Sequence, residues 1–280
     1  MRIGTLDGRA VLVEDDRALD IEAASGGRFP SSTRGVVERW DEVLEWVASA
    51  SRDGAVVLDP TRLDVPIADP RQVFAIGLNY RDHADEAGLA YPEHLVVFTK
   101  FQSSLGAPST DVELPSDDVD YETELVVVVG RGGRGIAEED GWNHVAGVSV
   151  GQDYSERAVQ TRGPAPQFSF GKSYPNFAPF GPVIVSIDEL DERDALPISA
   201  VLEGPGDERV VVQDGNSRDL IFSVPRIIAD LSAVVTLFPG DLIFTGTPAG
   251  VGMARGELLK RGQTLTSTIA GVGTFSNRLI

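Results

Sequence analysis

Cysteine is absent from the 280 residues of this sequence. Its absence excludes disulfide bonds, thiolate metal sites and a cysteine nucleophile. No apolar run reaches the ~18 residues that a membrane helix needs. The start of the chain, MRIGTLDGRAVLVEDD, lacks the basic segment followed by an apolar one that marks a signal peptide. We therefore expect a soluble protein of the cytoplasm, with no membrane among its partners.

Basic residues are few relative to acidic ones. The chain has 24 Lys and Arg residues against 43 Asp and Glu residues, which gives a formal net charge of −19. The field of such a chain repels nucleic acids and anionic membranes, so neither is expected as a partner. The acidic excess is explained most simply by solubility, although a local acidic pocket can still bind a cation.

The length of the chain fits one main domain with an appendage, and the sequence pattern changes near residue 70. The stretch RIGTLDGRAVLVEDDRALDI reads as two or three short strands with an Asp-Gly turn. In SSTRGVVERWDEVLEWVASASR, apolar residues recur at helical spacing after Ser and Thr residues that can cap a helix. The Pro-rich segment LDVPIADPRQ reads as a linker. We therefore expect a small N-terminal α/β domain over residues 1–69 and a larger domain over residues 70–280.

The larger part of the chain is a series of short apolar runs separated by turn residues. These runs are VFAIG, LVVFT, ELVVVVG, HVAGVSVG, GPVIVSI, RVVVQ and GDLIFTG. Long helical patterns are scarce, and the clearest is SVPRIIADLSAVVTLF, with a proline near its start. This pattern predicts a β-rich α+β fold of curved sheets and not a series of alternating βαβ units.

Three carboxylates lie where one of these buried strands begins, in the sequence VDYETELVVVVG. Asp120, Glu122 and Glu124 alternate with uncharged residues, so that in a strand they point to the same face. Residues 102–130 include seven acids and no Lys, Arg or His. Parallel carboxylates repel each other unless a proton or a cation lies between them. The stretch is either a solvated, acidic strand end or a site for a hard cation such as Mg²⁺ or Mn²⁺.

A cation site of this kind needs a third anionic ligand from elsewhere in the chain. The segment GVSVGQDYSERAVQ offers Asp153, just past another short strand. Spacing alone does not show that Asp153 meets Glu122.

A candidate base lies in the segment FAIGLNYRDHADEAG, which reads as a strand that leads into a short helix. Asn79 can cap this helix and Gly88 can end it. His83 and Glu86 are three residues apart and share a helix face. A carboxylate beside an imidazole fixes its tautomer and raises its basicity. The pair is therefore either a base that activates water or an ordinary surface ion pair.

Two loops offer groups that could bind an anion. Lys172 lies among aromatic residues and prolines in FSFGKSYPNFAPFGPVIV, where it could hold an anionic intermediate, although most such lysines are solvated. The segment GDLIFTGTPAGVG is a strand that opens into a Gly-rich loop, without the features of a Walker loop or a dinucleotide fingerprint. Its N–H groups and the hydroxyls of Thr245 and Thr247 could bind a carboxylate, and a tight turn explains the loop equally well.

Together and in this order, six segments resemble the fumarylacetoacetate hydrolase family. They span about residues 73–252, most of the larger domain. Each is a weak signal alone, and the combination in register is specific. The segments are GLNYRDHADE, DYETEL, GQDYSERAVQ, GKSYPNFAPFGP, QDGNSRDLIFSVPRIIADLS and PGDLIFTGTPAGVG.

The resemblance implies a mixed β-sheet roll as the catalytic domain, often with a small N-terminal domain, and a homodimer. Members of the family bind Mg²⁺, Mn²⁺ or sometimes Ca²⁺ through two glutamates and an aspartate, which match Glu122, Glu124 and Asp153. The catalytic His–Glu pair of the family matches His83 and Glu86.

The resemblance also implies which residues contact the substrate. The loop lysine of the family matches Lys172, and a substrate-contacting glutamine matches Gln160. The threonine that touches the substrate carboxylate matches Thr247, next to Gly246 in the same loop.

The sequence departs from the family pattern near these residues. The usual Asn-Asp is Gln152-Asp153, the usual Ser-Ala-Arg-Asp has Glu156 and Ala158, and the usual Phe-Asp after Lys172-Ser173 is Tyr174-Pro175. No ligand or base implied by the resemblance is lost. The changes alter the surroundings of the loop lysine and the ligand loop, and therefore bear on the substrate and on the outcome of the reaction.

We therefore expect a divalent-metal-dependent hydrolase that cleaves a C–C bond in a small 2-oxo acid or 1,3-diketone, such as an acylpyruvate or a substrate like fumarylacetoacetate. The same site can isomerise, decarboxylate or hydrate related acids, as in a 2-hydroxyhepta-2,4-diene-1,7-dioate isomerase or an oxaloacetate-type decarboxylase. His83 favours hydrolysis or hydration, because those reactions need a base for water. An alternative of another class is a non-catalytic member of the family that binds a cation.

Overall fold

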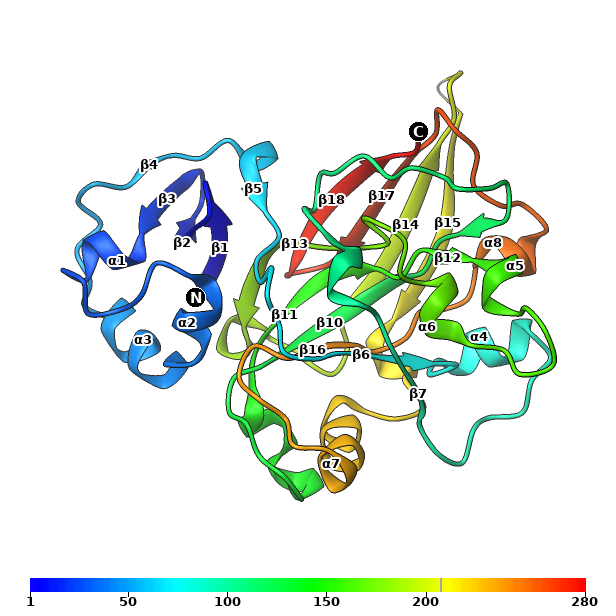
Figure 1. Cartoon of the computed structure of the whole chain (residues 1–280). Coiled ribbons are helices and arrows are strands. Elements are labelled where there is room, and N and C mark those ends of the chain that lie inside the picture. The colour runs from blue at the N-terminus through cyan, green and yellow to red at the C-terminus, as the bar shows by residue number, and fades with distance from the viewer. Residues whose placement is uncertain (207) are drawn as a thin grey trace.

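A large mixed β-sheet runs through the computed structural model of the chain, which describes residues 1–206 and 208–280 (Figure 1). Most neighbouring strands are antiparallel, but β16 and β6 run parallel. β5 (Leu63–Asp64) adds to β1, and β8 (Leu105–Gly106) adds to β13. The order along the sheet is β4 (Val56–Val57), β3 (Arg17–Asp20), β2 (Arg9–Glu14), β1 (Arg2–Leu6), β13 (Ala178–Ser186), β11 (Val145–Gln152), β10 (Thr123–Val129), β16 (Leu242–Phe244), β6 (Val73–Gly77) and β7 (Val96–Thr99).

A second sheet covers part of one face of the large sheet. Its order is β15 (Arg209–Asn216), β14 (Pro197–Glu203), β17 (Thr264–Ile269) and β18 (Gly273–Arg278). One hydrophobic cluster joins the two sheets, with Val127 and Val148 from the large sheet and Ile198 and Phe275 from the smaller one. A separate pair is formed by β9 (Val119–Asp120) and β12 (Ser155–Glu156). The predicted β-rich α+β class is confirmed.

The valine run of β10 is explained by burial on both faces. Leu125 and Val127 belong to the cluster shared with the second sheet, whereas Val126 and Val128 belong to a cluster on the opposite face. Every residue of β10 is buried. A strand covered on both faces reads as a continuous apolar run instead of an alternating one, so its charged start is the exception that needs a cause.

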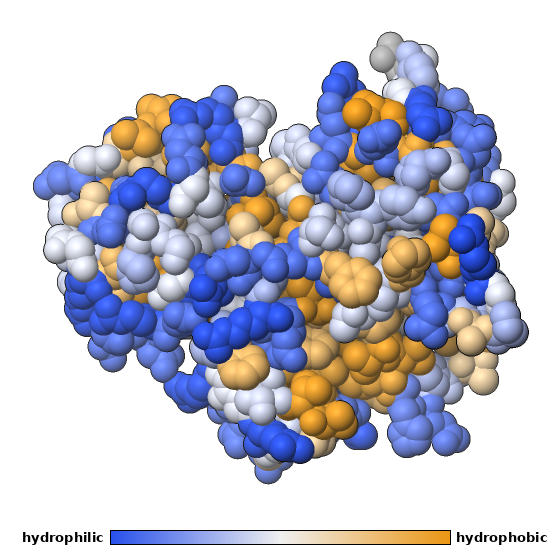
Figure 2. Space-filling view, in the orientation of Figure 1, coloured by the Kyte–Doolittle hydropathy of each residue, from blue (hydrophilic) through white to orange (hydrophobic). Residues whose placement is uncertain are grey.

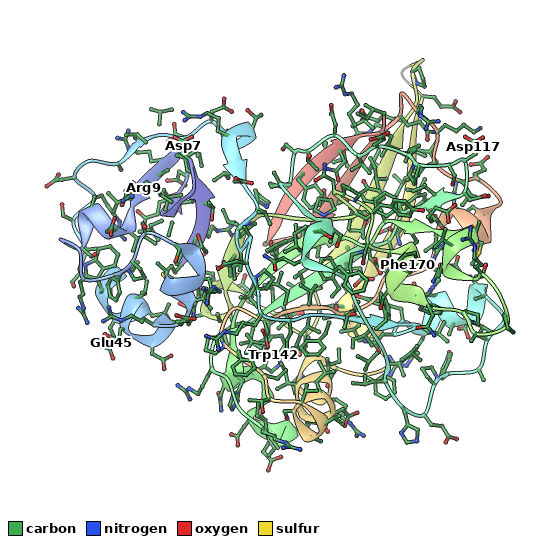
Figure 3. The ribbon with its side chains drawn as sticks, viewed as in Figure 1. Asp7, Arg9, Glu45, Asp117, Trp142 and Phe170 are labelled. Atoms are coloured by element: carbon green, nitrogen blue, oxygen red, sulfur yellow. The ribbon has the colours of Figure 1, made fainter. Side chains whose placement is uncertain are left out.

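The N-terminal part begins with the predicted hairpin. Asp7 and Gly8 have φ values of +51° and +74°, the left-handed pair that a two-residue turn between strands favours, and Asp7 lies at the tip of the hairpin (Figure 3). β1 pairs with β13, with Arg2 opposite Val185, so this part continues the large sheet. The proposed division of the chain between residues 69 and 70 remains a prediction.

The helical stretch that follows is two helices instead of one. After α1 (Ile21–Ala24), α2 (Thr33–Val37) and α3 (Trp40–Val47) are separated by a turn. Arg39 holds this turn, because its guanidinium donates to the Arg28 carbonyl and to Glu42. The segment predicted as a linker is also ordered, since it includes β5 and the buried Ile67.

Four short helices gather beside the ends of β10 and β11 (Figure 1). They are α4 (Arg81–Glu86), α5 (Arg157–Gln160), α6 (Phe168–Gly171) and α8 (Gly252–Arg255). The longest helix, α7 (Val224–Val234), has Ser223 as its N-cap and a proline in its first turn, as its sequence predicts. Short 3-10 turns occur at η1 (Pro60–Arg62), η2 (Gln102–Ser104), η3 (Glu138–His144), η4 (Ile187–Glu189) and η5 (Ser217–Asp219). In the described part of the chain, no helix has both the length and the apolar character needed to span a membrane.

Candidate active site

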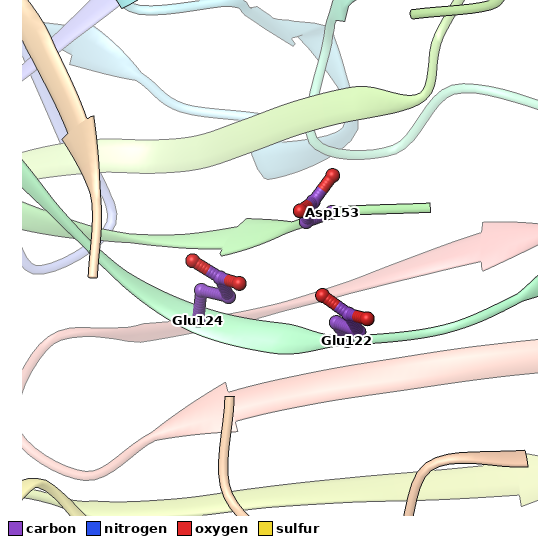
Figure 4. Close-up of side chains that lie close together, drawn as sticks. All are labelled: Glu122, Glu124 and Asp153. Atoms are coloured by element: carbon purple, nitrogen blue, oxygen red, sulfur yellow. The ribbon is translucent and has the colours of Figure 1, made fainter. Parts of the chain in front are cut away.

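Three carboxylates from neighbouring strands meet at one point. Glu124 lies in β10, Glu122 lies just before this strand, and Asp153 follows β11. The antiparallel pairing of β10 with β11 sets Asp153 beside Glu122, and the Asp153 N–H donates to the Glu122 carbonyl over 2.9 Å. One carboxylate oxygen from each residue lies within 4.8 Å of the others (Figure 4). The structure thus brings together the three residues that the sequence suggested as metal ligands.

Three cationic side chains from distant parts of the chain lie against these carboxylates. Lys172 Nζ donates to Glu122 Oε2 over 2.7 Å and to Asp153 Oδ2 over 2.6 Å. Arg157 Nη2 lies 2.8 Å from Glu122 Oε1, and Lys100 Nζ donates to Asp153 Oδ1. All three cationic residues are buried. The acidic stretch without local bases is therefore neutralised by long-range contacts.

The surrounding charges shift the pKa values of Glu122 and Glu124 in opposite directions. Burial opposes ionisation of Glu122, but the charges of Lys172 and Arg157 outweigh it and hold the pKa of Glu122 at about 2. Burial and the neighbouring charges of Asp153 and Glu122 raise the pKa of Glu124 well above its ordinary value. Glu124 is therefore the carboxyl of the cluster that favours a proton, or a cation in the place of that proton.

Two buried glutamines fix the strand that carries the glutamates. Gln152 Oε1 accepts the Glu122 N–H over 3.0 Å, and Gln152 Nε2 donates to the hydroxyl of Thr123 over 2.6 Å. Gln213 Oε1 accepts the Thr123 N–H over 3.0 Å, while Gln213 Nε2 donates to the Thr247 hydroxyl over 2.7 Å. The departure at Gln152 is thus built into the network that positions Glu122.

The Gly-rich loop after β16 closes this network. The Gly246 N–H donates to Glu124 Oε2 over 2.8 Å, and the Thr247 hydroxyl donates to the Thr123 carbonyl over 2.9 Å. Gly246 has a φ of +100°, and a Cβ there would lie 2.9 Å from the Cβ of Asn79. Only glycine therefore fits this close approach without strain.

His83 and Glu86 form the contact that their spacing predicted. His83 Nδ1 lies 2.8 Å from Glu86 Oε1, and Glu86 Oε2 accepts the Gly250 N–H over 2.9 Å. Glu86 is thereby held from two sides and orients the imidazole. The prediction that Asn79 caps α4 is wrong. Its side chain donates instead to the carbonyls of Phe222 and Thr245, which connects the start of the helix to two other segments.

These groups share one cavity of about 280 Å³. His83, Glu122, Glu124, Lys172 and Thr247 line it, as do Gln160 and Gly246. Asp153 lies behind them, fully buried. The sequence-predicted site residues are therefore gathered around one space large enough for a small organic molecule.

Sequence reasoning missed three residues of this site. Lys100 follows β7, and the only signal in the sequence is a lysine at the end of an apolar strand. Arg157 lies in the segment GQDYSERAVQ, where the sequence does not indicate its contacts, and its guanidinium contacts both Glu122 and Asp120. Gln213 lies at the end of a predicted strand, where the sequence does not indicate what it contacts.

The donor set of the cluster fits a hard divalent cation. It consists of carboxylate oxygens from Glu122, Glu124 and Asp153, without a nitrogen or sulfur donor among them. Mg²⁺, Mn²⁺ and Ca²⁺ prefer such oxygen ligands, whereas Zn²⁺ and Cu²⁺ sites usually include His or Cys. The residues present therefore fit the cation that the family resemblance implies.

Comparisons with known proteins identify the family to which the chain belongs. Residues 72–280 match the family model described as Fumarylacetoacetate (FAA) hydrolase C-terminal. The chain belongs to the fumarylacetoacetate hydrolase family. This confirms the resemblance seen in the sequence.

Relatives of this member of the fumarylacetoacetate hydrolase family cover nearly the whole chain. A mitochondrial oxaloacetate tautomerase of Xenopus laevis is 34% identical over 258 residues, which are 90% of this chain and 79% of the relative. An HpcE-like protein of Mycobacterium smegmatis has a crystal structure with a TM-score of 0.93 at 48% identity, covering 100% of this chain and 99% of that one. Maleylpyruvate hydrolase of Sphingobium, solved with manganese(II) and pyruvate, has a TM-score of 0.79 at 28% identity, with coverage of 100% and 99%. The predicted family roll is confirmed, and two of these relatives, the tautomerase and the hydrolase, are named for reactions of small molecules.

Proposed function

We propose that this protein is a divalent-metal-dependent enzyme that cleaves a C–C bond in a 2,4-dioxo acid of the acylpyruvate type. The observation that carries this proposal is the position of His83, which lines the same cavity as Glu122 and Glu124 of the three-carboxylate cluster and is oriented by Glu86. A base and a cation site around one cavity are the two parts that such a hydrolysis needs.

Glu122, Glu124 and Asp153 would hold the cation. When bound, the cation would act as a Lewis acid toward the oxygens of a 2-oxo acid. The maleylpyruvate hydrolase of similar fold, solved with manganese(II) and pyruvate, supports this assignment. Mn²⁺ and Mg²⁺ both suit the donor set, and Ca²⁺ is a third candidate.

The remaining groups of the cavity then have distinct tasks. His83 Nε2 takes a proton from water, while Glu86 keeps Nδ1 oriented. The hydroxide attacks the carbonyl distal to the carboxylate, the C–C bond breaks, and the released three-carbon fragment carries away the electron pair as an enolate. Lys172 lies where it can stabilise this negative charge, and burial keeps it effective. The Thr247 loop and Gln160 hold the carboxylate end of the substrate.

A second candidate reaction is tautomerisation or isomerisation of a 2-oxo acid on the same site. The oxaloacetate tautomerase of Xenopus laevis supports it. Such a reaction moves a proton between carbon and oxygen and needs no attacking water. Decarboxylation makes the same use of enolate stabilisation, so His83 is the residue that separates these reactions from hydrolysis. A member that only binds a cation is the remaining alternative, and a homodimer in the cytoplasm remains a prediction.

One panel of substrates tests the proposal. Purified protein with Mg²⁺ or Mn²⁺ is given acylpyruvates, oxaloacetate and a 2-hydroxy-dienedioate, and an EDTA-treated sample serves as control. We expect metal-dependent cleavage of an acylpyruvate and a loss of at least about 100-fold in kcat in His83→Ala, in line with the contribution of a general base. Unchanged cleavage in His83→Ala would contradict the role of this residue. Turnover confined to oxaloacetate or the dienedioate would favour the second candidate.

A further inference from the structure

The cavity has an apolar wall in addition to its charged groups. Leu89, Val96, Phe98, Phe168 and Met253 line it, and they come from the α4–β7 connection, β7, α6 and α8. The rings of Phe98 and Phe168 meet edge to face with centroids 5.7 Å apart. The cavity therefore has hydrophobic side chains from four segments in addition to the proposed catalytic groups.

Three of the wall residues pack around Gly77, at the end of β6. A Cβ added to Gly77 would lie 3.4 Å from Val96 and 3.6 Å and 3.7 Å from Phe168 and Phe98. Three wall residues therefore converge on one point, and the space beside them is bounded by carbon atoms. Water reaches part of this surface, since Leu89 and Met253 are more than half exposed. An alkyl or aryl group placed there would cover these carbon atoms, whereas a carboxylate would gain no ionic partner from them.

The cationic side chains that line the cavity form ion pairs with carboxylates of the protein. Among the described residues that line it, the only Lys and Arg side chains are Lys172 and Arg157. Lys172 is paired with two carboxylates, at 2.7 Å and 2.6 Å. Arg157 donates to Asp120 and to Gln160 and lies against Glu122. Both cationic groups therefore lie at the carboxylate cluster, where the proposed function seats the 2-oxo acid end of the substrate.

We propose that this wall selects 2-oxo acids whose distal end is an alkyl or aryl group over those that carry a second carboxylate. The inference rests on the proposed function, which seats the 2-oxo acid end of the substrate against the carboxylate cluster. The cavity of about 280 Å³ is larger than the ~150 Å³ of an engineered apolar cavity that holds benzene. A phenyl or branched alkyl tail therefore has room beside the wall.

Binding of two matched ligands tests this selection without any turnover. 5-Methyl-2-oxohexanoate and 2-oxoglutarate share the 2-oxo acid end and differ only in an isopropyl group against a carboxylate. Neither has the second oxo group that hydrolysis needs. Calorimetric titration of the protein with Mn²⁺ present should give a Kd at least about tenfold lower for the isopropyl ligand, because the isopropyl group covers exposed apolar surface of the wall and the carboxylate does not. Equal or tighter binding of 2-oxoglutarate would overturn the proposal.

A charge placed on the wall should change the preference. Leu89 is 53% exposed and tolerates a longer side chain, so Leu89→Arg should improve 2-oxoglutarate binding relative to 5-methyl-2-oxohexanoate by about tenfold, since it adds a donor for the second carboxylate. Phe170 lies on α6, is 70% exposed and does not line the cavity (Figure 3). Phe170→Arg adds the same charge outside the wall and should leave the ratio unchanged. A ratio that shifts equally in both variants, or in neither, would contradict a role for the wall.

The outcomes separate this inference from the proposed function. Cleavage of an acylpyruvate together with a preference for 2-oxoglutarate would refute only the role of the wall. A preference for the isopropyl ligand without cleavage of any 2,4-dioxo acid would refute only the reaction. Met253→Arg, at a position 57% exposed, repeats the test from α8 if Leu89→Arg loses Mn²⁺ affinity.

Discussion

Ion pairs of the same chemical type occur in two very different settings in this protein. In the carboxylate cluster, Lys100 and Asp153 are both fully buried. In the N-terminal part, Arg62 of η1 meets Asp7 of the hairpin at 2.6 Å, with their side chains 56% and 65% exposed. Water screens the second pair and barely reaches the first. A short distance therefore carries little information about importance, whereas burial does.

The two regions also differ in what surrounds their charges. Around the cluster, charged groups share neighbours, since Lys172 contacts Glu122 and Asp153, and Arg157 contacts the same Glu122 and Asp120. Ion pairs of the N-terminal part also share partners in places, as where Arg9 contacts Asp20 and Glu22, but their side chains are partly exposed. Figure 2 shows hydrophilic residues over much of this part in that view. A change in the buried cluster should thus affect several partners strongly, and a change at an exposed pair such as Arg62–Asp7 should not.

The largest apolar area in the view of Figure 2 belongs to the larger part of the molecule and lies near β7. Val96 and Val97 of this strand are 38% and 46% exposed. Val96 also lines the cavity. The same edge strand therefore contributes to the surface and to the proposed specificity wall.

The largest effect is expected from breaking the buried pair. Lys100→Met leaves Asp153 buried without one of its two cations, and removal of one partner of such a pair typically lowers the free energy of unfolding by about 3–5 kcal/mol. Urea unfolding in EDTA measures this change. A loss below about 1 kcal/mol would show that the buried pair behaves like a surface pair.

A neutral buried network should give an intermediate effect. Gln213→Leu leaves the Thr123 N–H and the Thr247 hydroxyl without one partner each, and each buried unsatisfied group typically costs about 1–3 kcal/mol. The same unfolding experiment measures it. Gln263→Leu is the matched control, because Gln263 accepts an exposed backbone N–H from Lys260. Equal losses in the two variants would contradict the importance of burial.

Protons should compete with cations at the cluster. The pKa of Glu124 is raised above its ordinary value of 4.5, so its contribution to stability is present below that value and is lost as pH rises through the raised pKa. Cation binding runs in the opposite direction, because the ligand must be deprotonated. Mn²⁺ affinity should rise with pH by up to about tenfold per unit until Glu124 is ionised. An affinity independent of pH between about 5.5 and 7.5 would contradict this pKa shift.

The smallest effect is expected at the surface pair. Arg62→Gln should change the free energy of unfolding by no more than about 1 kcal/mol, and less at high salt, because exposed ion pairs contribute little. Urea unfolding at low and high ionic strength checks both parts. A loss as large as that of Lys100→Met would remove the contrast between the two regions.

Local patterns in the sequence predicted the parts of this structure that local physics decides. The apolar runs listed from the sequence form strands in the structure. His83 and Glu86 are in contact as their spacing predicts, because the period of a helix fixes which residues share a face. Asp7 and Gly8 form the predicted hairpin turn because both residues tolerate the positive φ values that a two-residue turn favours. The family resemblance supplied the grouping of Asp153 with the glutamates, which spacing did not.

The features that the sequence did not predict depend mainly on which distant segments meet in the fold. Lys100 and Asp153 are 53 residues apart in the chain, and no pattern in either segment predicts that contact. Asn79 is a good helix cap by type, but two distant carbonyls compete for its side chain. The sequence did not predict β17 and β18, because polar residues occupy most of their positions, nor β14, because Ser199 interrupts its short apolar run.

The central claim is that Glu122, Glu124 and Asp153 together bind one divalent cation. Anomalous diffraction from crystals grown with Mn²⁺ tests it most directly. The account predicts one strong peak per chain among the three carboxylates, at Mn–O distances of about 2.0–2.4 Å, absent in Glu124→Gln. A fully occupied Mn²⁺ elsewhere, with no peak at this cluster, would contradict it.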